Sequence, residues 1–471
     1  MAVDSSTSAR MRDDALRLFR HADDRPVHLV GIAGAGMSAL AELFARRGLR
    51  VTGSDMSAAG NADLEALGIT VHRGHSADFV AGTRAVVASS AIAQDHVELA
   101  AATVLGLPII RRAEALGAAV AGMQIVGIAG THGKTTTTVM TTEALAGTTA
   151  SPTGIVGGRV QRWGGNLRWG GGNTVVVEAD EYDRSFLALH PTIAVVTNVE
   201  ADHLDIYADL ADIVGAFELY LANATGIVIC ADDAGASSLT LPQTADVIRY
   251  GLDTVDARLV GIRDGNSLQV VFDGAPLGSL TLQVPGDHNR RNALAAVAAG
   301  LLLGFPFDEL RTGLEAFVGV ERRFERKGEV NDIIVIDDYA HHPTEVRATL
   351  EAARAAFPGR RIVALFQPHL YTRTRDFADE FGRALAVGAD VIALTDIYKA
   401  REQPIAGVSA QLIADAATSA GHAPDWFGLR VDATAAVANL VQPGDVVLTM
   451  GAGDVTLVGP EILAALRGVT S

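Results

Sequence analysis

A glycine-rich turn between an apolar segment and a polar helix start is the first place where this sequence could do chemistry. Residues 124–137 are Gln-Ile-Val-Gly-Ile-Ala-Gly-Thr-His-Gly-Lys-Thr-Thr-Thr. Glycines let backbone N–H groups converge on phosphate oxygens, and the helix that follows adds the positive end of its dipole. A lysine at this position could reach the terminal phosphates of a nucleotide, and a threonine hydroxyl could ligate Mg²⁺. The turn predicts ATP binding by Gly130, Thr131, His132, Gly133, Lys134, Thr135 and Thr136.

The spacing of this turn is shorter than the full G-x-x-x-x-G-K-S/T pattern, because Gly130 stands only three residues before Gly133. A glycine-rich turn with a surface lysine is therefore the alternative. Lysine usage argues against it: the chain has three lysines, Lys134, Lys327 and Lys399, and otherwise uses arginine. A lysine in the turn suggests that a compact ammonium group is needed there.

Two acidic runs follow the phosphate loop, each directly after an apolar strand-like segment. Residues 173–177 lead to Glu178, Asp180 and Glu181, and residues 192–196 lead to a run that contains Asp202 and His203. Carboxylate oxygens are the ligands that Mg²⁺ prefers. One such run alone is commonly a helix N-cap, but two runs with an imidazole beside them favour a metal site.

The N-terminal part of the chain has a second glycine turn. Residues 27–30 predict a strand, Gly31-Ile-Ala-Gly34-Ala-Gly36-Met37 a turn, and the next residues a helix and a strand that ends at Asp55. This unit is close to the dinucleotide fingerprint, but Ala33 replaces one of its glycines. The pattern indicates a nucleotide or pyrophosphate without specifying NAD, and a purely structural turn is the alternative. His75, Ser89 and Ser90 are further candidate contacts, because polar residues at strand ends bind ligands in such sheets.

The C-terminal part repeats apolar strands that each end in polar residues. These ends are 337–343 (Asp-Asp-Tyr-Ala-His-His-Pro), 367–373 (Gln-Pro-His-Leu-Tyr-Thr-Arg), Asp396 and 451–454 (Gly-Ala-Gly-Asp). Together they predict a ligand-binding parallel sheet. Zinc is not expected at His341 and His342, because neighbouring side chains diverge and no third soft ligand has suitable spacing. His288 and Asn289 begin a predicted helix, where they could cap it or contact adenine.

Composition narrows the class of protein. A length of 471 residues predicts about two to four domains, and 49% hydrophobic with 20% charged residues is ordinary for a globular protein. The net charge of −17 argues against nucleic acid as a partner. One cysteine, Cys230, cannot form an internal disulfide. Residues 1–24 lack a hydrophobic signal segment, and the apolar run 293–307 is too short to span a membrane. A cytoplasmic protein without membrane contacts is expected.

Taken together, these motifs resemble the Mur ligase family of ATP-dependent amide-forming enzymes, over residues 27–454. Gly-Thr-His-Gly-Lys-Thr-Thr is typical of the whole family. The alanine-adding members are indicated by Gly34-Ala-Gly-Met-Ser38 and by the polar runs at 337–343, 367–369 and 450–454. The resemblance implies an α/β fold of three domains: an N-terminal Rossmann-like parallel sheet (1–122), a central P-loop-type ATPase domain (123–328) and a C-terminal Rossmann-like domain (329–471).

The resemblance also implies the reaction and its participants. ATP and Mg²⁺ would drive the joining of L-alanine to the lactoyl carboxylate of UDP-N-acetylmuramate, through an acyl phosphate, in peptidoglycan precursor synthesis. The enzyme would be a monomer or homodimer.

The residues implied by the resemblance fall into four groups. UDP-sugar contacts would be Gly34, Gly36, Met37, Asp55, His75, Ser89 and Ser90. ATP contacts beyond the phosphate loop would be His288, Asn289, Asn292, Arg323 and Asp338. Metal ligands would be Thr135 and Glu178 for one Mg²⁺ and His203 for a second. Tyr339, His341 and Arg373 would hold L-alanine and the reacting carboxylate. The groups acting in catalysis would be Lys134, His203, His341 and Arg373.

Two features bear on the assignment within the family. Several sister ligases use a carbamylated lysine in the central domain, and this chain has no lysine between Lys134 and Lys327. Leu370 stands where many members have arginine, so the anchoring of the substrate differs in one cationic contact.

Four alternatives compete with this assignment. A folate or cyanophycin-type ligase would share the central domain but would not need the first glycine-loop domain. A murein-recycling ligase that adds a tripeptide to the same sugar nucleotide typically differs in its first glycine loop. A regulatory ATPase would have no use for the third polar cleft. A hydride-transfer enzyme is disfavoured by the altered fingerprint and by the second, ATP-type loop.

Overall fold

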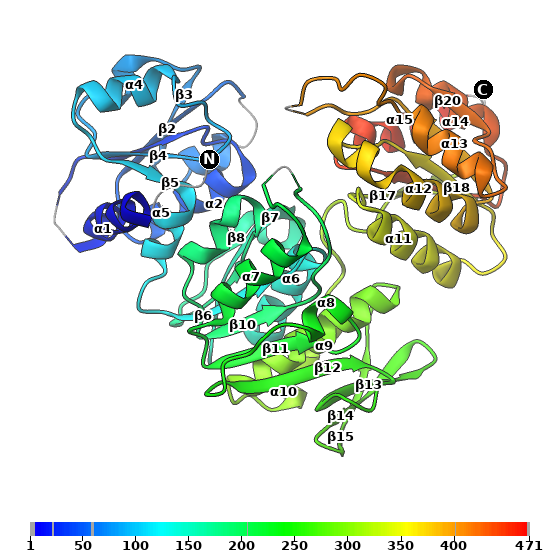
Figure 1. The fold of residues 1–471 in the computed structure, drawn as a ribbon, viewed down its shortest axis with the longest axis horizontal. Coiled ribbons are helices and arrows are strands. Elements are labelled where there is room, and N and C mark those ends of the chain that lie inside the picture. Colours follow the sequence, from blue (N-terminus) through cyan, green and yellow to red (C-terminus); the bar gives the residue numbers. More distant parts are fainter. Residues whose placement is uncertain (1–4, 21–22, 58–60, 205, 401, 469–471) are drawn as a thin grey trace. The chain divides into compact units, whose positions relative to one another are not determined.

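The computed structural model describes residues 5–20, 23–57, 61–204, 206–400 and 402–468 (Figure 1). The chain divides into two compact units, residues 1–281 with 291–316 and residues 282–290 with 317–471. The chain ends 1–4 and 469–471, which the predicted first and third domains include, lie outside the described residues.

The first sheet of unit 1 is parallel throughout. Its strands are β1 (Val27–Val30), β2 (Val51–Asp55), β3 (Thr70–Arg73), β4 (Ala85–Ala88) and β5 (Ile109–Arg111), in the order β3-β2-β1-β4-β5. The strand β1 has the predicted bounds, and both β1 and β4 are buried along their whole length. Because the chain leaves β1 toward β2 and later returns to β4 on the other side, the loops after β1 and β4 flank the switch point where such sheets bind ligands.

Helices cover this first sheet. They are α1 (Ser5–Arg20), α2 (Ala35–Arg46), α3 (Asn61–Glu65), α4 (Val97–Val104) and α5 (Arg112–Ala119), with the short η1 (Ala77–Val80). No helix is predicted from the sequence for the polar N-terminus. The structure forms α1 there, and Ala15 and Leu18 from α1 join the buried core.

The second sheet of unit 1 is built around the phosphate loop. Its parallel centre consists of β9 (Thr174–Glu178), β6 (Gln124–Ala129), β10 (Ile193–Val196), β11 (Gly226–Cys230) and β12 (Asp246–Leu252). The remaining strands are β7 (Thr153–Val160) and β8 (Gly165–Arg168) at one edge, and β13 (Leu259–Asp264), β14 (Ser267–Phe272) and β15 (Ala275–Thr281) at the other. Since β9 and β10 flank β6 in parallel, the residues after all three strands meet at one edge of the sheet.

The helices around the second sheet are α6 (Lys134–Ala146), α7 (Leu210–Leu221), α8 (Ala234–Ser237), α9 (Asp287–Leu302) and α10 (Phe307–Glu315), with η2 (Gln161–Trp163) and η3 (Tyr182–Ala188). One hydrophobic core runs from the first sheet to the second. Gly117 of α5 lies so close to η3 that an added Cβ would be 2.4 Å from the carbonyl oxygen of Ala188. The two sheets therefore pack into one unit, although the sequence predicted a domain for each.

Unit 2 holds the third sheet. It is parallel in β17 (Ile333–Asp338), β21 (Val446–Met450), β18 (Ile362–Phe366), β19 (Val391–Thr395) and β20 (Trp426–Gly428), with β16 (Glu325–Val330) antiparallel at one edge. Its helices are α11 (Pro343–Ala356), α12 (Tyr371–Gly388), α13 (Gln411–Ser419), α14 (Ala433–Leu440) and α15 (Val458–Gly468), with η4 (Arg430–Asp432) and η5 (Asp454–Leu457). Buried side chains cover both faces of the sheet.

Three largely parallel α/β sheets confirm the predicted fold class. The predicted boundary after residue 328 needs correction, because it would cut β16, whose residue Gly328 pairs with Val335 of β17. We place that boundary before β16. None of the helices among the described residues is both long and apolar enough to cross a membrane.

Candidate active site

The phosphate loop has a shape that requires glycine. Gly130 and Gly133 have φ angles of +135° and +80°, and Gly133 is the N-cap of α6. An added Cβ would lie 2.0 Å from Thr197 Oγ1 at Gly130 and 2.8 Å from Asn292 Oδ1 at Gly133. The positive φ angles and the close contacts exclude larger residues, and the first N–H groups of α6 have no carbonyl partner within the helix.

The segment after β10 holds this loop in place. The His132 N–H donates to Asn198 Oδ1 at 2.7 Å, and the Thr197 hydroxyl donates to the His132 carbonyl at 2.6 Å. The Glu200 N–H donates to Thr131 Oγ1 at 2.9 Å. The structure therefore joins the predicted phosphate loop to the start of the second acidic run.

The two predicted ligands of the first Mg²⁺ lie together. The Thr135 hydroxyl donates to Glu178 Oε1 at 2.7 Å, and the Gly157 N–H donates to Glu178 Oε2 at 2.6 Å. Thr135 and Glu178 thus present adjacent oxygen atoms beside the phosphate loop, which is the donor chemistry that Mg²⁺ accepts. Thr136, also predicted to contact ATP, is buried on α6.

Lys134 is paired with Glu181, a carboxylate of the first acidic run. Its ammonium donates to the carbonyls of Gly130 (2.7 Å) and Thr131 (3.1 Å) and to Glu181 Oε1 (2.9 Å). Burial acts to lower the pKa of Lys134, but the carboxylates of Glu181, Asp180 and Glu178 together outweigh it and raise that pKa. Burial acts to raise the pKa of Glu181, and the ammonium of Lys134 opposes this by favouring the carboxylate.

His203 lies near the same carboxylate. Its Nε2 is 3.9 Å from Glu181 Oε1 and 3.9 Å from Asp202 Oδ2, and its ring packs edge-on against Tyr182 at 5.1 Å. The acidic runs after β9 and β10 therefore meet, as their positions in the sequence predicted.

The glycine turn after β1 is stabilised by Asp55. The Ala33 N–H donates to Asp55 Oδ2 at 2.9 Å, and the Ser57 N–H donates to Asp55 Oδ1 at 2.8 Å. A Cβ at Gly36 would lie 2.9 Å from Arg112 Nη1, so the turn passes close to a cation. Met37, also predicted to contact the UDP-sugar, is only 3% exposed and its side chain packs in the core.

Glu98 organises the polar groups beside this turn and was missed by the sequence analysis. Its carboxylate accepts from the Ser54 hydroxyl (2.7 Å) and the Ser76 N–H (3.2 Å), and lies 3.3 Å from His75 Nδ1 and 3.5 Å from His28 Nε2. Burial acts to raise the pKa of Glu98, but these hydrogen bonds outweigh it and lower that pKa to about 2. A glutamate in the first turn of the otherwise apolar α4 was the only available signal.

Ser89 and Ser90 follow β4 at the same edge of the sheet. An added Cβ at Gly31 would lie 3.4 Å from Ile92 Cδ1, which shows that the loops after β1 and β4 adjoin. The predicted UDP-sugar contacts other than Met37 therefore belong to loops at one edge of the first sheet.

Helix α9 carries the three residues predicted to meet adenine. Asn289 Nδ2 donates to the Pro285 carbonyl at 2.6 Å, so this amide has a structural role at the helix start. Asn292 approaches Gly133 of the phosphate loop, as described above. A Cβ at Gly286 would be 2.6 Å from His288 Cε1, so the His288 ring folds back over the turn before the helix.

In unit 2, two arginines enclose an aromatic ring. The guanidinium carbons of Arg322 and Arg323 lie 4.8 Å and 5.0 Å from the ring centre of Tyr339. Asp338 accepts the N–H groups of Phe324 (2.7 Å) and Ala340 (2.8 Å). Burial raises the pKa of Asp338 to about 6, although the charge of Arg323 opposes this.

The groups predicted to hold the amino acid also lie close together. His341 Nδ1 is 3.0 Å from the Tyr339 carbonyl and 3.0 Å from Glu345 Oε2. Both partners accept hydrogen bonds, so Nδ1 carries the hydrogen and Nε2 the lone pair. The His341 ring is 5.9 Å from that of His369, whose Nδ1 is 3.5 Å from Arg373 Nη1. Tyr339, His341 and Arg373 are therefore linked through His369.

Some motif residues prove to be structural. Gln367 donates to Asp454 Oδ1 at 2.8 Å and accepts the Val455 N–H at 3.0 Å, so it ties the end of β18 to the segment after β21. Asp337 accepts hydroxyl hydrogen bonds from Thr449 and Thr456, each at 2.8 Å. Leu370, the departure from the family pattern, has φ +70° directly before α12.

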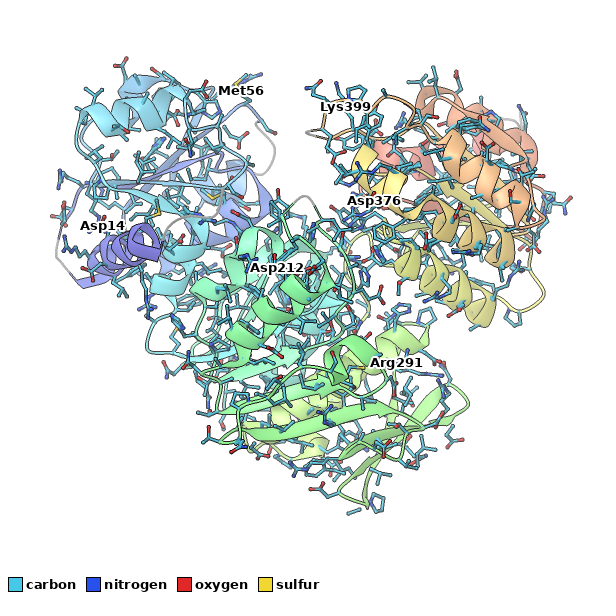
Figure 2. All side chains as sticks on the ribbon, viewed as in Figure 1. Asp14, Met56, Asp212, Arg291, Asp376 and Lys399 are labelled. Carbon is cyan, nitrogen blue, oxygen red and sulfur yellow. The ribbon has the colours of Figure 1, made fainter. Side chains whose placement is uncertain are left out.

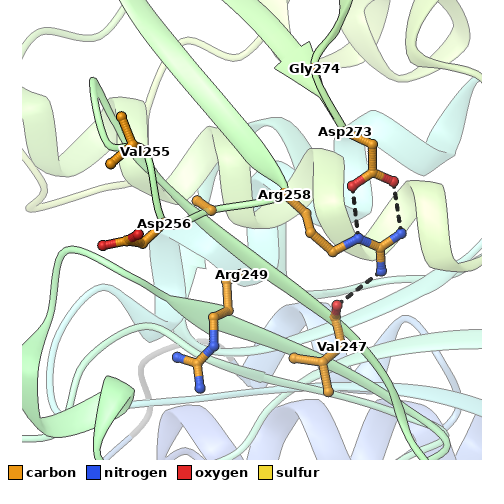
Figure 3. A pocket seen from close by; sticks show the side chains of 8 residues that line it. Val247, Arg249, Val255, Asp256, Arg258, Asp273 and Gly274 are labelled. Atoms are coloured by element: carbon orange, nitrogen blue, oxygen red, sulfur yellow. Dashed lines mark hydrogen bonds and ion pairs between the residues drawn. The ribbon is translucent and has the colours of Figure 1, made fainter.

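A separate cavity of about 440 Å³ lies at the β12–β14 end of the second sheet (Figure 3). It contains none of the predicted site residues. Arg258, which lines it, is neutralised there by two 2.9 Å hydrogen bonds to Asp273. The cavity therefore does not contribute to the candidate site.

Comparison with known proteins agrees with this geometry. Residues 26–123 match the Mur ligase family catalytic domain, residues 128–300 the Mur ligase middle domain, and residues 322–453 the Mur ligase glutamate ligase domain. A UDP-N-acetylmuramate–L-alanine ligase from Salinibacter ruber is 47% identical over 443 residues, which cover 92% of this chain and 93% of the relative.

Solved structures of ligases are also similar to this chain. The crystal structure of UDP-N-acetylmuramate-alanine ligase MurC from Thermotoga maritima is 29% identical, with a TM-score of 0.78, and the match covers 94% of this chain and 99% of that one. A murein peptide ligase from Psychrobacter arcticus shares the fold at 24% identity, with a TM-score of 0.69 over 94% of this chain and 98% of that one. The domain matches and the near full-length identity show that this chain belongs to the Mur ligase family.

Proposed function

We propose that the chain is an ATP-dependent UDP-N-acetylmuramate–L-alanine ligase. The observation that carries the proposal is the phosphate loop, where Lys134 and the oxygen pair of Thr135 and Glu178 lie at the start of α6. Similarity to relatives of that name over more than nine-tenths of the chain supports the choice of substrates. The absence of lysine between Lys134 and Lys327 agrees with a member that does not use a carbamylated lysine.

In the proposed reaction, an oxygen of the lactoyl carboxylate attacks the γ-phosphorus of ATP, and the bond to the β-phosphate oxygen breaks. ADP leaves, and the carboxylate becomes an acyl phosphate. Phosphoryl transfer depends mainly on positioning and on neutralised charge. Lys134 supplies positive charge at the phosphates, with Arg323 proposed as a second cation. Mg²⁺ held by Thr135 and Glu178, with a second Mg²⁺ at His203, would neutralise further phosphate charge.

The amine of L-alanine then attacks the acyl carbon, and the tetrahedral intermediate expels phosphate. The alanine ammonium must lose a proton before it can attack. His341 is the proposed base, because its Nδ1 is committed to two acceptors and its Nε2 carries the lone pair. Tyr339 and Arg373 are the proposed contacts for alanine and the reacting carboxylate. His288, Asn289, Asn292 and Asp338 complete the proposed ATP contacts.

The sugar nucleotide is proposed to bind at the edge of the first sheet, at Gly34, Gly36, Asp55, His75, Ser89 and Ser90. We further propose a first domain that ends at residue 122, activity in the cytoplasm, where ATP is available, and a monomer or homodimer.

The test is phosphate release from ATP with Mg²⁺ and UDP-N-acetylmuramate, with single amino acids and the tripeptide supplied in parallel. Release that requires both the sugar nucleotide and L-alanine is expected. Lys134→Ala should lower it at least about 100-fold, the usual effect of removing one stabilising group, whereas Lys327→Ala should not. Release with the tripeptide but not with alanine would instead identify a murein-recycling ligase. Release without the sugar nucleotide would show that the first sheet has been misassigned.

A further inference from the structure

We infer that Glu181 is an internal counter-ion that holds Lys134 until a nucleotide displaces it, and that it thereby lowers the affinity of the loop for nucleotide. This inference rests on the proposed function, in which Lys134 binds the phosphates of ATP. Glu181 belongs neither to the glycine loop nor to the predicted Mg²⁺ ligands, and the proposed reaction gives it no task.

The first observation is that the ammonium of Lys134 is fully occupied. An ammonium has three N–H donors. In this structure the acceptors are the carbonyls of Gly130 and Thr131 and the carboxylate of Glu181, whose two oxygens lie 2.9 Å and 2.8 Å from Nζ. A phosphate oxygen can accept a hydrogen bond from Lys134 only by replacing one of these acceptors. Of the three, only Glu181 carries a negative charge, so it is the acceptor that competes most directly with an anionic phosphate.

The second observation is that the pair is shielded from water. The Glu181 side chain is 4% exposed and the Lys134 side chain 14%. A carboxylate and an ammonium attract each other more strongly away from bulk water than at the surface. Removing one partner from a buried pair leaves the other charge uncompensated. When Lys134 turns to a phosphate, Glu181 therefore loses its cation in a place that water hardly reaches.

The third observation is that Glu181 is anchored and cannot readily follow the lysine. The Tyr207 hydroxyl donates to the Glu181 carbonyl at 2.7 Å. The ring of Tyr207 packs against the Arg184 guanidinium at 5.0 Å, and Arg184 donates to Asp212 Oδ1 at 2.6 Å. Asp212 lies on α7, where Figure 2 labels it. This chain of contacts fixes the backbone of Glu181 while the lysine changes partner.

These observations make Glu181 a positioning residue that acts through Lys134. Without nucleotide it keeps the ammonium over the loop in an ordered position. With nucleotide it is a nearby negative charge that opposes binding of polyphosphate and favours release of ADP.

The test is ADP binding by calorimetry to the full chain, in EDTA so that no metal contributes. Glu181→Gln retains the size of the side chain but removes its charge, and should bind ADP at least about tenfold more tightly than the unchanged protein, or 1.4 kcal/mol at 25 °C. Glu181→Asp keeps the charge on a shorter side chain, so its affinity for ADP should lie between those of Glu181→Gln and the unchanged protein. In turnover, Glu181→Gln should lower the KM for ATP without a matching rise in kcat.

Thermal unfolding separates this role from ordinary structural support. Without nucleotide, Glu181→Gln should lower the unfolding temperature, because Lys134 loses its partner. With saturating ADP the difference from the unchanged protein should shrink or vanish. Glu143→Gln is the matched control: Glu143 is buried on the same helix as Lys134 and accepts from Trp163 Nε1 at 2.6 Å. That variant should be destabilised equally with and without ADP.

Three results would overturn the inference. Weaker ADP binding by Glu181→Gln in EDTA would mean that Glu181 supports the lysine in the bound state. Unchanged ADP binding in EDTA, with a higher Mg²⁺ requirement in turnover, would make Glu181 a metal ligand. Equal destabilisation with and without ADP would make it a structural residue. Failure of the unchanged protein to bind ADP would be a different result, since it would refute the proposed ATP site itself.

Discussion

Glu178 and Glu181 stand three residues apart in one acidic run, yet they contact different partners. Glu178 accepts from Thr135, whereas Glu181 pairs with Lys134. Neighbouring residues of the phosphate loop therefore contact neighbouring carboxylates, of which we propose one as a ligand of Mg²⁺ and the other as a counter-ion. Residue type alone cannot distinguish these tasks, because both side chains carry the same group. The partner and the degree of burial decide between them.

Glu98 gives a test of electrostatics within the first sheet. Its pKa of about 2 lies below the value of 4.5 for a free glutamate, so its ionised form stabilises the fold at pH above 4.5 and loses this effect as the pH falls toward 2. The shift corresponds to about 3 kcal/mol. Glu98→Gln should therefore have a lower free energy of unfolding than the unchanged protein at pH 7, and this difference should become smaller below pH 4.5. Urea unfolding from pH 3 to pH 8 measures the free energy of unfolding of both proteins.

Glu114 is the matched contrast for that experiment. It is also buried in the same part of the chain, but there burial raises the pKa, so its charged form is disfavoured in the folded state. For Glu114→Gln the pH dependence should have the opposite sign, with the variant gaining stability relative to the unchanged protein as the pH rises. A difference independent of pH for Glu98→Gln would contradict the role assigned to its hydrogen bonds.

The two ends of helix α6 show how backbone conformation positions a functional group. The start of α6 depends on Gly133, whereas the end of the same helix has Gly147 at φ −84° with no atom within 4 Å of an added Cβ. The two glycines differ only in conformation and surroundings, so they form a matched pair.

Gly133→Ala should lose nucleotide binding by at least about tenfold and lose about 1–2 kcal/mol of stability, because an L-residue is strained at a positive φ. The new Cβ would also press on Asn292 Oδ1. Gly147→Ala should bind normally and be unchanged or up to about 1 kcal/mol more stable. Calorimetry and urea unfolding give both quantities. Equal behaviour of the two variants would show that the loop conformation does not control binding.

The glycine-rich stretch between residues 154 and 172 has no clear strand signal, because glycines are depleted in strands. It nevertheless forms the antiparallel pair β7 and β8. Added Cβ atoms at Gly170 and Gly172 would lie 2.1 Å and 1.8 Å from the carbonyl oxygens of Ser151 and Ala150. The glycines thus allow close backbone approach, and Gly157 of β7 also donates to Glu178.

At the scale of the complete chain, the proposed contacts for ATP are divided between the two compact units. Unit 1 contributes Lys134 and Thr135, and unit 2 contributes Arg323 and Asp338. A substitution of a proposed ATP contact in unit 2 should therefore impair ATP chemistry without disturbing the phosphate loop of unit 1.

Arg323→Ala should lower ATP-dependent phosphate release roughly 100-fold, as expected for a lost charge at a developing anion. Arg326→Ala, three residues along, is the control, since its guanidinium pairs with Glu329 and is exposed. Thermal unfolding must show that both variants are folded, because Arg323 also lies 3.7 Å from Glu345. Full activity of Arg323→Ala would remove this residue from the proposed site.

Much of the fold could be predicted from the sequence, because strand and turn signals are local. Buried parallel strands are short apolar runs, and β1, β9 and β10 lie at the predicted residues to within one position. The phosphate loop was also evident, since its glycines and Lys134 are adjacent in the chain. Where local pattern was weak, as in α1 and β7, the elements were missed because packing against distant segments decides them.

By itself, the sequence determined the fold class, the family and the positions of the polar strand ends, because each depends on residues close together in the chain. Only the tertiary structure decided which polar groups become partners. Glu98 meets His75 across the first sheet, Glu181 meets Lys134 across 47 residues, and Met37 turns into the core. These outcomes depend on sheet order and burial, since parallel strands bring together residues that are distant in the sequence.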